Sequence, residues 1–321
     1  MSIVELMKGY KLCVETCMGV KPGEHIVIIT DLDNMANAKA LAIASQMADA
    51  NAIILCQTSL KKFTLEPPEM IVECMKKSDV ILVSLPFFYS ALFFHTNARK
   101  EAVKNGARFA IVQVTPENAD ITREEIIKTK YLSEKIAALL NETKEVRVKT
   151  NNGTNLTMTV QGRKSVPISS LLDQPGASGT IPDFAEAAIA PIEGSAEGVV
   201  VIDGSISGIG SVQEPIVWKI RKGRLIEIKG KEEAQKLKDL LKKTDSNSTN
   251  IAELGIGTVA RGKVTGDPDD KRILGTGHIA IGDNRFGGGN IASDIHLDGV
   301  FMNMTLELDG KVIMEDGMLK L

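Results

Sequence analysis

Short apolar stretches rich in isoleucine and valine alternate with amphipathic stretches through the first 142 residues. Four apolar stretches have the length and composition of strands that are buried on both faces of a parallel sheet. They are residues 25–30, 52–57, 80–86 and 109–114. Segments with helical spacing lie at residues 34–50, 67–77, 89–105 and 122–141. This alternation favours right-handed crossovers and predicts an α/β domain with a doubly wound, mostly parallel sheet.

The pattern changes to strands and tight turns from residue 143 onward. Residues 145–150 and 155–160 flank Asn152-Gly153, which is a strong hairpin signal. The further segments that read as strands are 198–206, 217–223, 224–230, 278–282 and 296–317, the last with Asp309-Gly310 as the turn of a hairpin. One amphipathic helix is expected at residues 231–243. We therefore predict two domains, an α/β domain over residues 1–142 and a mainly antiparallel α+β domain over residues 143–321.

Composition narrows the class of protein. The length of 321 residues agrees with two domains, and a net charge of −3 without a basic tract argues against nucleic-acid partners. No apolar run reaches the roughly 18 residues of a membrane span, and none matches a secretory signal. The 4 cysteines are too few for a disulfide framework. These features predict a cytoplasmic enzyme or binding protein without a membrane partner.

A first group of candidate metal ligands contains two histidines and one aspartate. His296 and Asp298 are two positions apart on an alternating segment, so on a strand both side chains lie on one face. His278 opens another alternating segment, which a neighbouring strand can bring to the same ion. Two histidines and one carboxylate suit Fe(II), Mn, Co or Zn. The alternative is a histidine that only hydrogen-bonds a neighbouring aspartate in a sheet.

Two carboxylates lie in apolar surroundings. Glu186 is in IPDFAEAAIAPIEGS, and Glu253 is in NIAELGIGT. An isolated buried carboxylate is costly, so such a residue is paired, protonated or bound to a metal; otherwise each side chain lies at a turn and reaches water. Together with His278, His296 and Asp298, they supply enough ligands for two divalent ions that share a bridging carboxylate.

The order of these segments resembles that of the thermophilic aminopeptidases, the aminopeptidase T family of co-catalytic metallopeptidases. The segments are AEAAIAPIEGSAEGVVVIDG, AELGIGT, GHIAIGD and SDIHLDGV, and the resemblance covers about residues 180–300. It implies Glu186 and Glu253 as carboxylate ligands, one of them bridging, and His278, His296 and Asp298 as the others. The implied function is a homodimeric aminopeptidase that uses Zn, Co or Mn to hydrolyse small peptides.

The glycine-rich loop after His278 reads GDNRFGGGN. The aminopeptidases place a catalytic tyrosine in this loop, whereas this chain has Arg285 and Phe286. Arg285 is a candidate for stabilising a developing oxyanion or for binding a substrate carboxylate. Glu253 is the candidate for shuttling the proton during hydrolysis.

The chain also resembles 2,5-dihydroxypyridine dioxygenase, a ring-cleaving family on the same scaffold, in the stretch FFHTNARKEAVKNGAR at residues 93–108. This resemblance implies one Fe(II) ion held by His278, His296 and Asp298, with His95 near the substrate. His95 is otherwise a capping or surface residue. The sequence thus predicts a metalloaminopeptidase, with a mononuclear Fe(II) dioxygenase as the alternative and a non-enzymatic binding protein as a third possibility.

Overall fold

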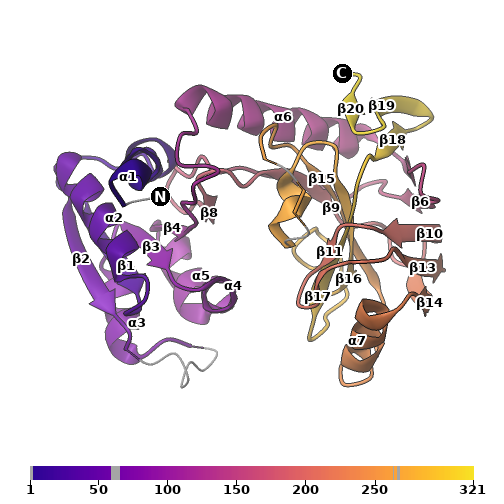
Figure 1. The fold of residues 1–321 in the computed structure, drawn as a ribbon, viewed down its shortest axis with the longest axis horizontal. Helices are drawn as coiled ribbons and strands as arrows, with labels where there is room; N and C mark the ends of the chain where they lie inside the picture. Colours follow the sequence, from indigo (N-terminus) through magenta and orange to yellow (C-terminus); the bar gives the residue numbers. More distant parts are fainter. Residues whose placement is uncertain (1–2, 59–65, 263, 266–267) are drawn as a thin grey trace. The chain divides into compact units, whose positions relative to one another are not determined.

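The computed structural model describes residues 3–58, 66–262, 264–265 and 268–321, and the chain forms two compact units (Figure 1). The first unit consists of Met1–Lys130 and Ser169–Phe184, and the second consists of Tyr131–Ile168 and Ala185–Leu321. The first is an α/β unit and the second is built from antiparallel sheets. The predicted fold class is therefore confirmed.

A five-stranded parallel sheet forms the centre of the first unit, with the order β2-β1-β3-β4-β8. Its strands are β1 (His25–Thr30), β2 (Asn51–Cys56), β3 (Val80–Ser84), β4 (Arg108–Val112) and β8 (Ser178–Ile181). The four predicted strands of this domain correspond to β1 to β4. The fifth strand, β8, comes from a later part of the chain and pairs with β4.

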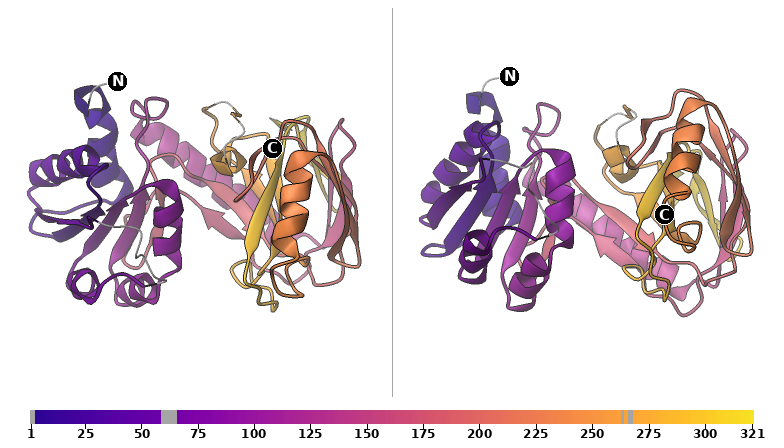
Figure 2. Two further views of the ribbon diagram at one scale, coloured as in Figure 1. Left: turned by 60° about the horizontal axis from the view of Figure 1, so that its bottom comes forward. Right: turned by 90° about the horizontal axis from the view of Figure 1, so that it is seen from below.

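Helices cover both faces of this parallel sheet (Figure 2). They are α1 (Ile3–Leu12), the π-helix η1 (Cys13–Cys17), α2 (Met35–Met47), α3 (Glu69–Lys76), α4 (Phe87–His95) and α5 (Asn97–Lys104). Ile26 and Ile28 of β1 pack in one cluster with α1, η1 and α2, whereas Val27 and Ile29 pack in another with α3, α4 and α5. Alternate residues of a strand point to opposite faces, so the apolar run of β1 supplies both cores.

The prediction of one helix over residues 89–105 is wrong, because the structure divides this segment at Thr96. Thr96 has an extended backbone with ψ 150°, and its hydroxyl accepts a hydrogen bond from the Arg99 amide at 3.1 Å. A threonine that caps the next helix in this way ends the preceding one. The predicted helix therefore becomes α4 and α5.

Two antiparallel sheets form the second unit. The strands of the larger sheet are β14 (Arg224–Lys229), β13 (Ile216–Arg221), β10 (Glu197–Ile202), β6 (Asn155–Thr159), β5 (Glu145–Lys149), β18 (Thr305–Leu308), β19 (Lys311–Glu315) and β20 (Met318–Leu319). The strands of the other sheet, called sheet C below, are β12 (Gly210–Ser211), β11 (Ser205–Ile206), β17 (His296–Phe301), β16 (Gly277–Gly282), β15 (Ile251–Gly257), β9 (Glu186–Ile189) and β7 (Val166–Ile168).

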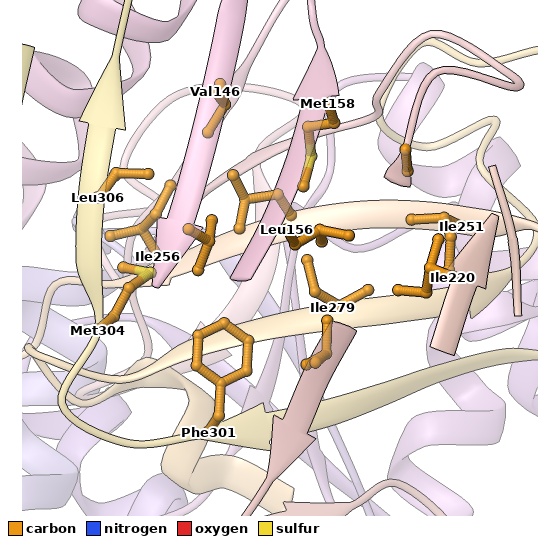
Figure 3. Packing of buried hydrophobic residues seen from close by; sticks show 14 of the residues in the cluster. Val146, Leu156, Met158, Ile220, Ile251, Ile256, Ile279, Phe301, Met304 and Leu306 are labelled. Carbon is orange, nitrogen blue, oxygen red and sulfur yellow. The ribbon is translucent and has the colours of Figure 1, made fainter. Parts of the chain in front are cut away.

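The two sheets enclose the main apolar core of the second unit. Val146 and Leu156 of the larger sheet interleave with Ile279 and Phe301 of sheet C (Figure 3). Sheet C therefore has one face in this core and a second face turned away from it. The candidate ligands lie on the second face.

Within the described residues, three helices contribute to the second unit. They are α6 (Arg123–Glu142), of which the last part belongs here, α7 (Glu232–Leu241) and the 3-10 helix η3 (Pro268–Arg272). Ile136 and Leu140 of α6 join the core, and α7 confirms the helix predicted at residues 231–243. Within the described part of the chain, no helix combines the length and the apolar character that crossing a bilayer requires.

Candidate metal centre

Strand β15 carries Glu253 to the outer face of sheet C by means of a β-bulge. The pairing with β16 shifts register between Ile251 and Glu253, so that Ala252 is an additional residue in β15 without a paired residue on β16. Ile251 and Leu254 consequently both pack into the core although they are three positions apart. Glu253 lies on the opposite face and is nevertheless only 3% exposed.

The neighbouring strands add the other four candidate ligands. His296 and Asp298 lie two positions apart on β17, and Glu186 begins β9. His278 of β16 lies directly opposite Gly255 of β15. A Cβ atom at Gly255 would be 1.9 Å from His278 Cε1, so the imidazole occupies the space above a residue that has to be glycine.

The five candidate ligands fall into two groups that share Glu253. Glu186, Glu253 and His278 form one group, and Glu253, His296 and Asp298 form the other, with the ligand atoms of each group within 4.8 Å of one another. Glu253 Oε1 lies 3.1 Å from His278 Nε2, and Glu253 Oε2 lies 3.8 Å from His296 Nε2. His296 Nε2 is 3.3 Å from Asp298 Oδ1. Each group thus contains two carboxylates and one imidazole, and divalent ions bind to both kinds of ligand.

Lys271 of η3 reaches the same cluster from the side. Its ammonium donates to Asp298 Oδ2 at 3.0 Å and lies 3.7 Å from Glu186 Oε1. The Ser207 hydroxyl also donates to Asp298 Oδ2, at 3.3 Å. On the other side, His296 Nδ1 is 2.8 Å from the backbone oxygen of Asp283. A ring N–H donated to that carbonyl leaves His296 Nε2 available as a ligand atom.

Burial and mutual charge alter the pKa values of this cluster. Burial raises the pKa of Glu186, and the nearby Lys271 ammonium only partly opposes this. Burial also acts to raise the pKa of Asp298, but Lys271 and the two imidazoles lower it well below its usual range. Burial lowers the pKa of His296, whereas Asp298 and Glu253 raise it more strongly, to about 9. In the metal-free protein, a proton on His296 therefore offsets part of the carboxylate charge at neutral pH, and a metal ion that binds His296 has to displace it.

Divalent ions fit these residues. Glu186 Oε2 and Asp298 Oδ1 are buried and accept no hydrogen bond from any residue that the structure describes. Buried carboxylate oxygens are normally satisfied, so these two are available for a cation. They lie 3.9 Å and 4.0 Å from His278 Nε2, which places them beside the other ligand atoms. Glu186, Glu253, His278, His296 and Asp298 would hold the metal.

Of the two further residues expected at the site, Arg285 is not part of this cluster, and His95 belongs to the first unit. Arg285 lies in the loop after β16 with its side chain 63% exposed, and its Nε donates to Asp283 Oδ2 at 2.8 Å. His95 is exposed at the end of α4, in the first unit, where its ring contacts Phe94 edge to face. Their suggested roles in catalysis and substrate binding stay predictions.

Sequence reasoning missed Lys271, Ser207 and the requirement for glycine at position 255. Lys271 belongs to the charged run DPDDKR, which is typical of a solvated surface. Gly255 carries a usable signal, because it follows Glu253 by two positions and therefore shares its face of the strand.

Comparison with known proteins decides the family. The profile of the family NicX, described as 2,5-dihydroxypyridine 5,6-dioxygenase, matches residues 5–321. The chain belongs to this family. A comparison with curated proteins returns no match.

Two solved structures share the fold of this NicX-family chain. The 2,5-dihydroxypyridine dioxygenase of Pseudomonas putida KT2440 aligns with a TM-score of 0.78 and 19% identity, over 99% of this chain and 98% of that one. Wild-type AmpT of Thermus thermophilus aligns with a TM-score of 0.72 and 18% identity, over 99% of each chain. Both resemblances found in the sequence are thus confirmed, and this member of the NicX family is an enzyme. The expected divalent metal cofactor is likewise confirmed, because the family match and the two ligand groups agree with it.

Adding a divalent ion to the metal-free enzyme should stabilise the second unit. Metal at about 100 times its Kd adds about 2.7 kcal/mol to the free energy of unfolding, which raises Tm by about 5–10 °C for a domain of this size. Trp218, the only tryptophan of the chain, is buried in the core of the second unit, so its fluorescence reports that transition. The rise should be absent in Glu253→Gln, which alters both ligand groups; an equal rise in that variant would place the stabilising ion elsewhere.

Proposed function

We propose that this NicX-family enzyme is a two-ion metallohydrolase that removes N-terminal residues from small peptides. The observation that carries the proposal is the position of Glu253, which directs one oxygen to His278 and the other to His296. A carboxylate shared by two ligand groups is typical of co-catalytic sites, in which two ions lie about 3.5–4 Å apart. When bound, the two ions would polarise the scissile carbonyl and lower the pKa of the attacking water.

The residues of the chain would hold and orient these ions. Glu186 and His278 would complete one ligand group, and His296 and Asp298 would complete the other. The Asp283 carbonyl fixes the His296 ring, and Ser207 with Lys271 fixes the Asp298 carboxylate. Such contacts behind the ligands keep their geometry and basicity.

Proton transfer would fall to Glu253 in this proposal. Its pKa lies below its ordinary value, because the hydrogen bond with His278 and the charge of His296 outweigh the effect of burial. The carboxylate is therefore ionised near neutral pH, and it would accept a proton from water through an oxygen that is not bound to an ion at that moment. Arg285, on the glycine-rich loop, is the candidate for contacting the substrate carbonyl or carboxylate.

The test measures amide hydrolysis in the presence and absence of O₂. Protein loaded with Zn²⁺, Co²⁺ or Mn²⁺ should release leucine from leucine amide and from dipeptides equally well with and without O₂. A chain with Asp298→Asn should lose this activity, while Asp294→Asn, which changes an exposed aspartate nearby, should keep it. Absence of amide hydrolysis under all three metals would refute the hydrolase.

A second candidate is a mononuclear Fe(II) dioxygenase, which the family match over residues 5–321 favours. Its two-histidine, one-carboxylate set would be His278, His296 and Asp298. In that case Fe(II)-loaded protein should consume one O₂ for each 2,5-dihydroxypyridine that it cleaves. His95→Ala should then raise KM for the ring substrate.

A further inference from the structure

Lys271 is a cation built into the metal centre. Its side chain is 17% exposed, and its ammonium lies 3.0 Å from Asp298 Oδ2 and 3.7 Å from Glu186 Oε1. Asp298 belongs to one ligand group and Glu186 to the other. Lys271 therefore contacts both halves of the cluster at once.

The ammonium approaches one oxygen of each carboxylate and leaves the other oxygen available to bind a metal ion. Lys271 approaches Oδ2 of Asp298 and Oε1 of Glu186, whereas Oδ1 and Oε2 of the same residues lie toward His278 Nε2. These inner oxygens have no hydrogen-bond partner among the described residues. Lys271 thus adds positive charge beside the ions without removing a ligand from either group.

The charge of the cluster limits how many ions it binds tightly. With neutral imidazoles, the carboxylates of Glu186, Glu253 and Asp298 and the ammonium of Lys271 carry a net charge of −2. One divalent ion balances this charge. A second ion adds to a cluster that is already neutral, and it does so in a buried site where charge is poorly screened.

We propose that Lys271 makes the affinities for the two ions unequal. One divalent ion binds tightly, and the ammonium weakens binding of the second ion at least tenfold. This inference rests on the two-ion function proposed above. It identifies Lys271 as a positioning residue that also sets the order of metal loading. The protein would then carry one ion per chain at low metal concentration and two ions only at higher concentration.

The test is a titration of metal-free protein with Mn²⁺ alone, followed by the EPR signal of the free ion, with native mass spectrometry for stoichiometry. Wild type should show two classes of site whose Kd values differ at least tenfold. Lys271→Met keeps an apolar side chain of similar length and removes the charge. We expect it to bind the second ion at least tenfold more tightly than wild type and the first ion no more weakly.

Matched variants separate charge from structure. Lys236→Met removes an exposed ammonium that pairs with Glu232 on α7, and should leave both Kd values unchanged. Lys271→Arg should keep the wild-type inequality. If Lys271→Met does not fold, as judged by Trp218 fluorescence, Lys271→Ala replaces it. Added methylammonium, which enters the space left by the side chain, should then weaken binding of the second ion again. Sodium at the same concentration should leave binding of the second ion unchanged.

Each outcome decides the inference. An unchanged isotherm in Lys271→Met overturns it, and so does weaker binding of both ions, which would mean that Lys271 only supports the fold. If wild type binds one ion at every concentration and Lys271→Met binds two, the role of Lys271 stands and the two-ion function fails. Two ions of equal affinity in wild type leave the hydrolase intact and refute the inference.

Discussion

Glu253→Gln should reduce bound metal to less than one ion per chain and lower kcat for peptide hydrolysis by at least about 10³-fold. Glutamine preserves the volume of the side chain but removes the charge and one oxygen ligand. Because Glu253 faces both His278 and His296, its loss affects both ligand groups at once. Metal content is measured by elemental analysis after dialysis, and turnover by release of leucine.

The control for this prediction is Glu227→Gln, which removes an exposed carboxylate on β14. It should retain wild-type metal content and turnover. Two tightly bound ions in Glu253→Gln would contradict the shared role of this residue. Normal metal content with abolished turnover would instead restrict Glu253 to proton transfer.

Gly255→Ala should destabilise the second unit by about 3 kcal/mol and weaken metal binding at least 100-fold. The added Cβ would be 1.9 Å from His278 Cε1, so the imidazole has to leave its position above the strand. Urea unfolding followed by Trp218 fluorescence measures the first effect, and metal titration measures the second.

A double variant distinguishes this clash from a general effect on β15. In Gly255→Ala/His278→Ala the imidazole that collides with the new methyl group is absent. The double variant should therefore recover stability relative to Gly255→Ala alone, although metal binding remains weak. Strictly additive losses would show that His278 is not what the methyl group meets.

The strands of the first unit were largely predictable because each carries its own signal. β1, β3 and β4 are continuous apolar runs, and such runs are typical of strands with two buried faces. β8 has the sequence Ser-Gly-Thr-Ile, without such a run, and its place beside β4 depends on pairing across the fold. Local pattern cannot specify a strand whose stability comes from its neighbour.

The second unit shows the same limit. Residues 198–206 read as one strand, but the structure separates them into β10 in the larger sheet and β11 in sheet C. The apolar pattern continues through both because each strand contributes to the same core: Val200 and Ile202 come from β10, and Ile206 from β11. Hydrophobicity alone does not reveal the change of sheet.

The candidate ligands were accessible from sequence to different degrees. The spacing of His296 and Asp298 is local, since two residues apart on a strand share a face. Glu253 stood out by its apolar surroundings, although the bulge that orients it gave no signal. Lys271 was missed because its burial depends on η3 packing against β15 and β17, which are distant in sequence.

The position of β8 has a consequence for the nascent chain. β4 receives its partner only when Ser178 has been synthesised, after the chain has already supplied α6 and the first strands of the second unit. At 5–20 residues per second, the outer edge of β4 stays bare on the ribosome for roughly 3–13 s. All residues of β4 are buried in the finished protein, and its unpaired backbone edge can form wrong strand pairs until β8 has been made.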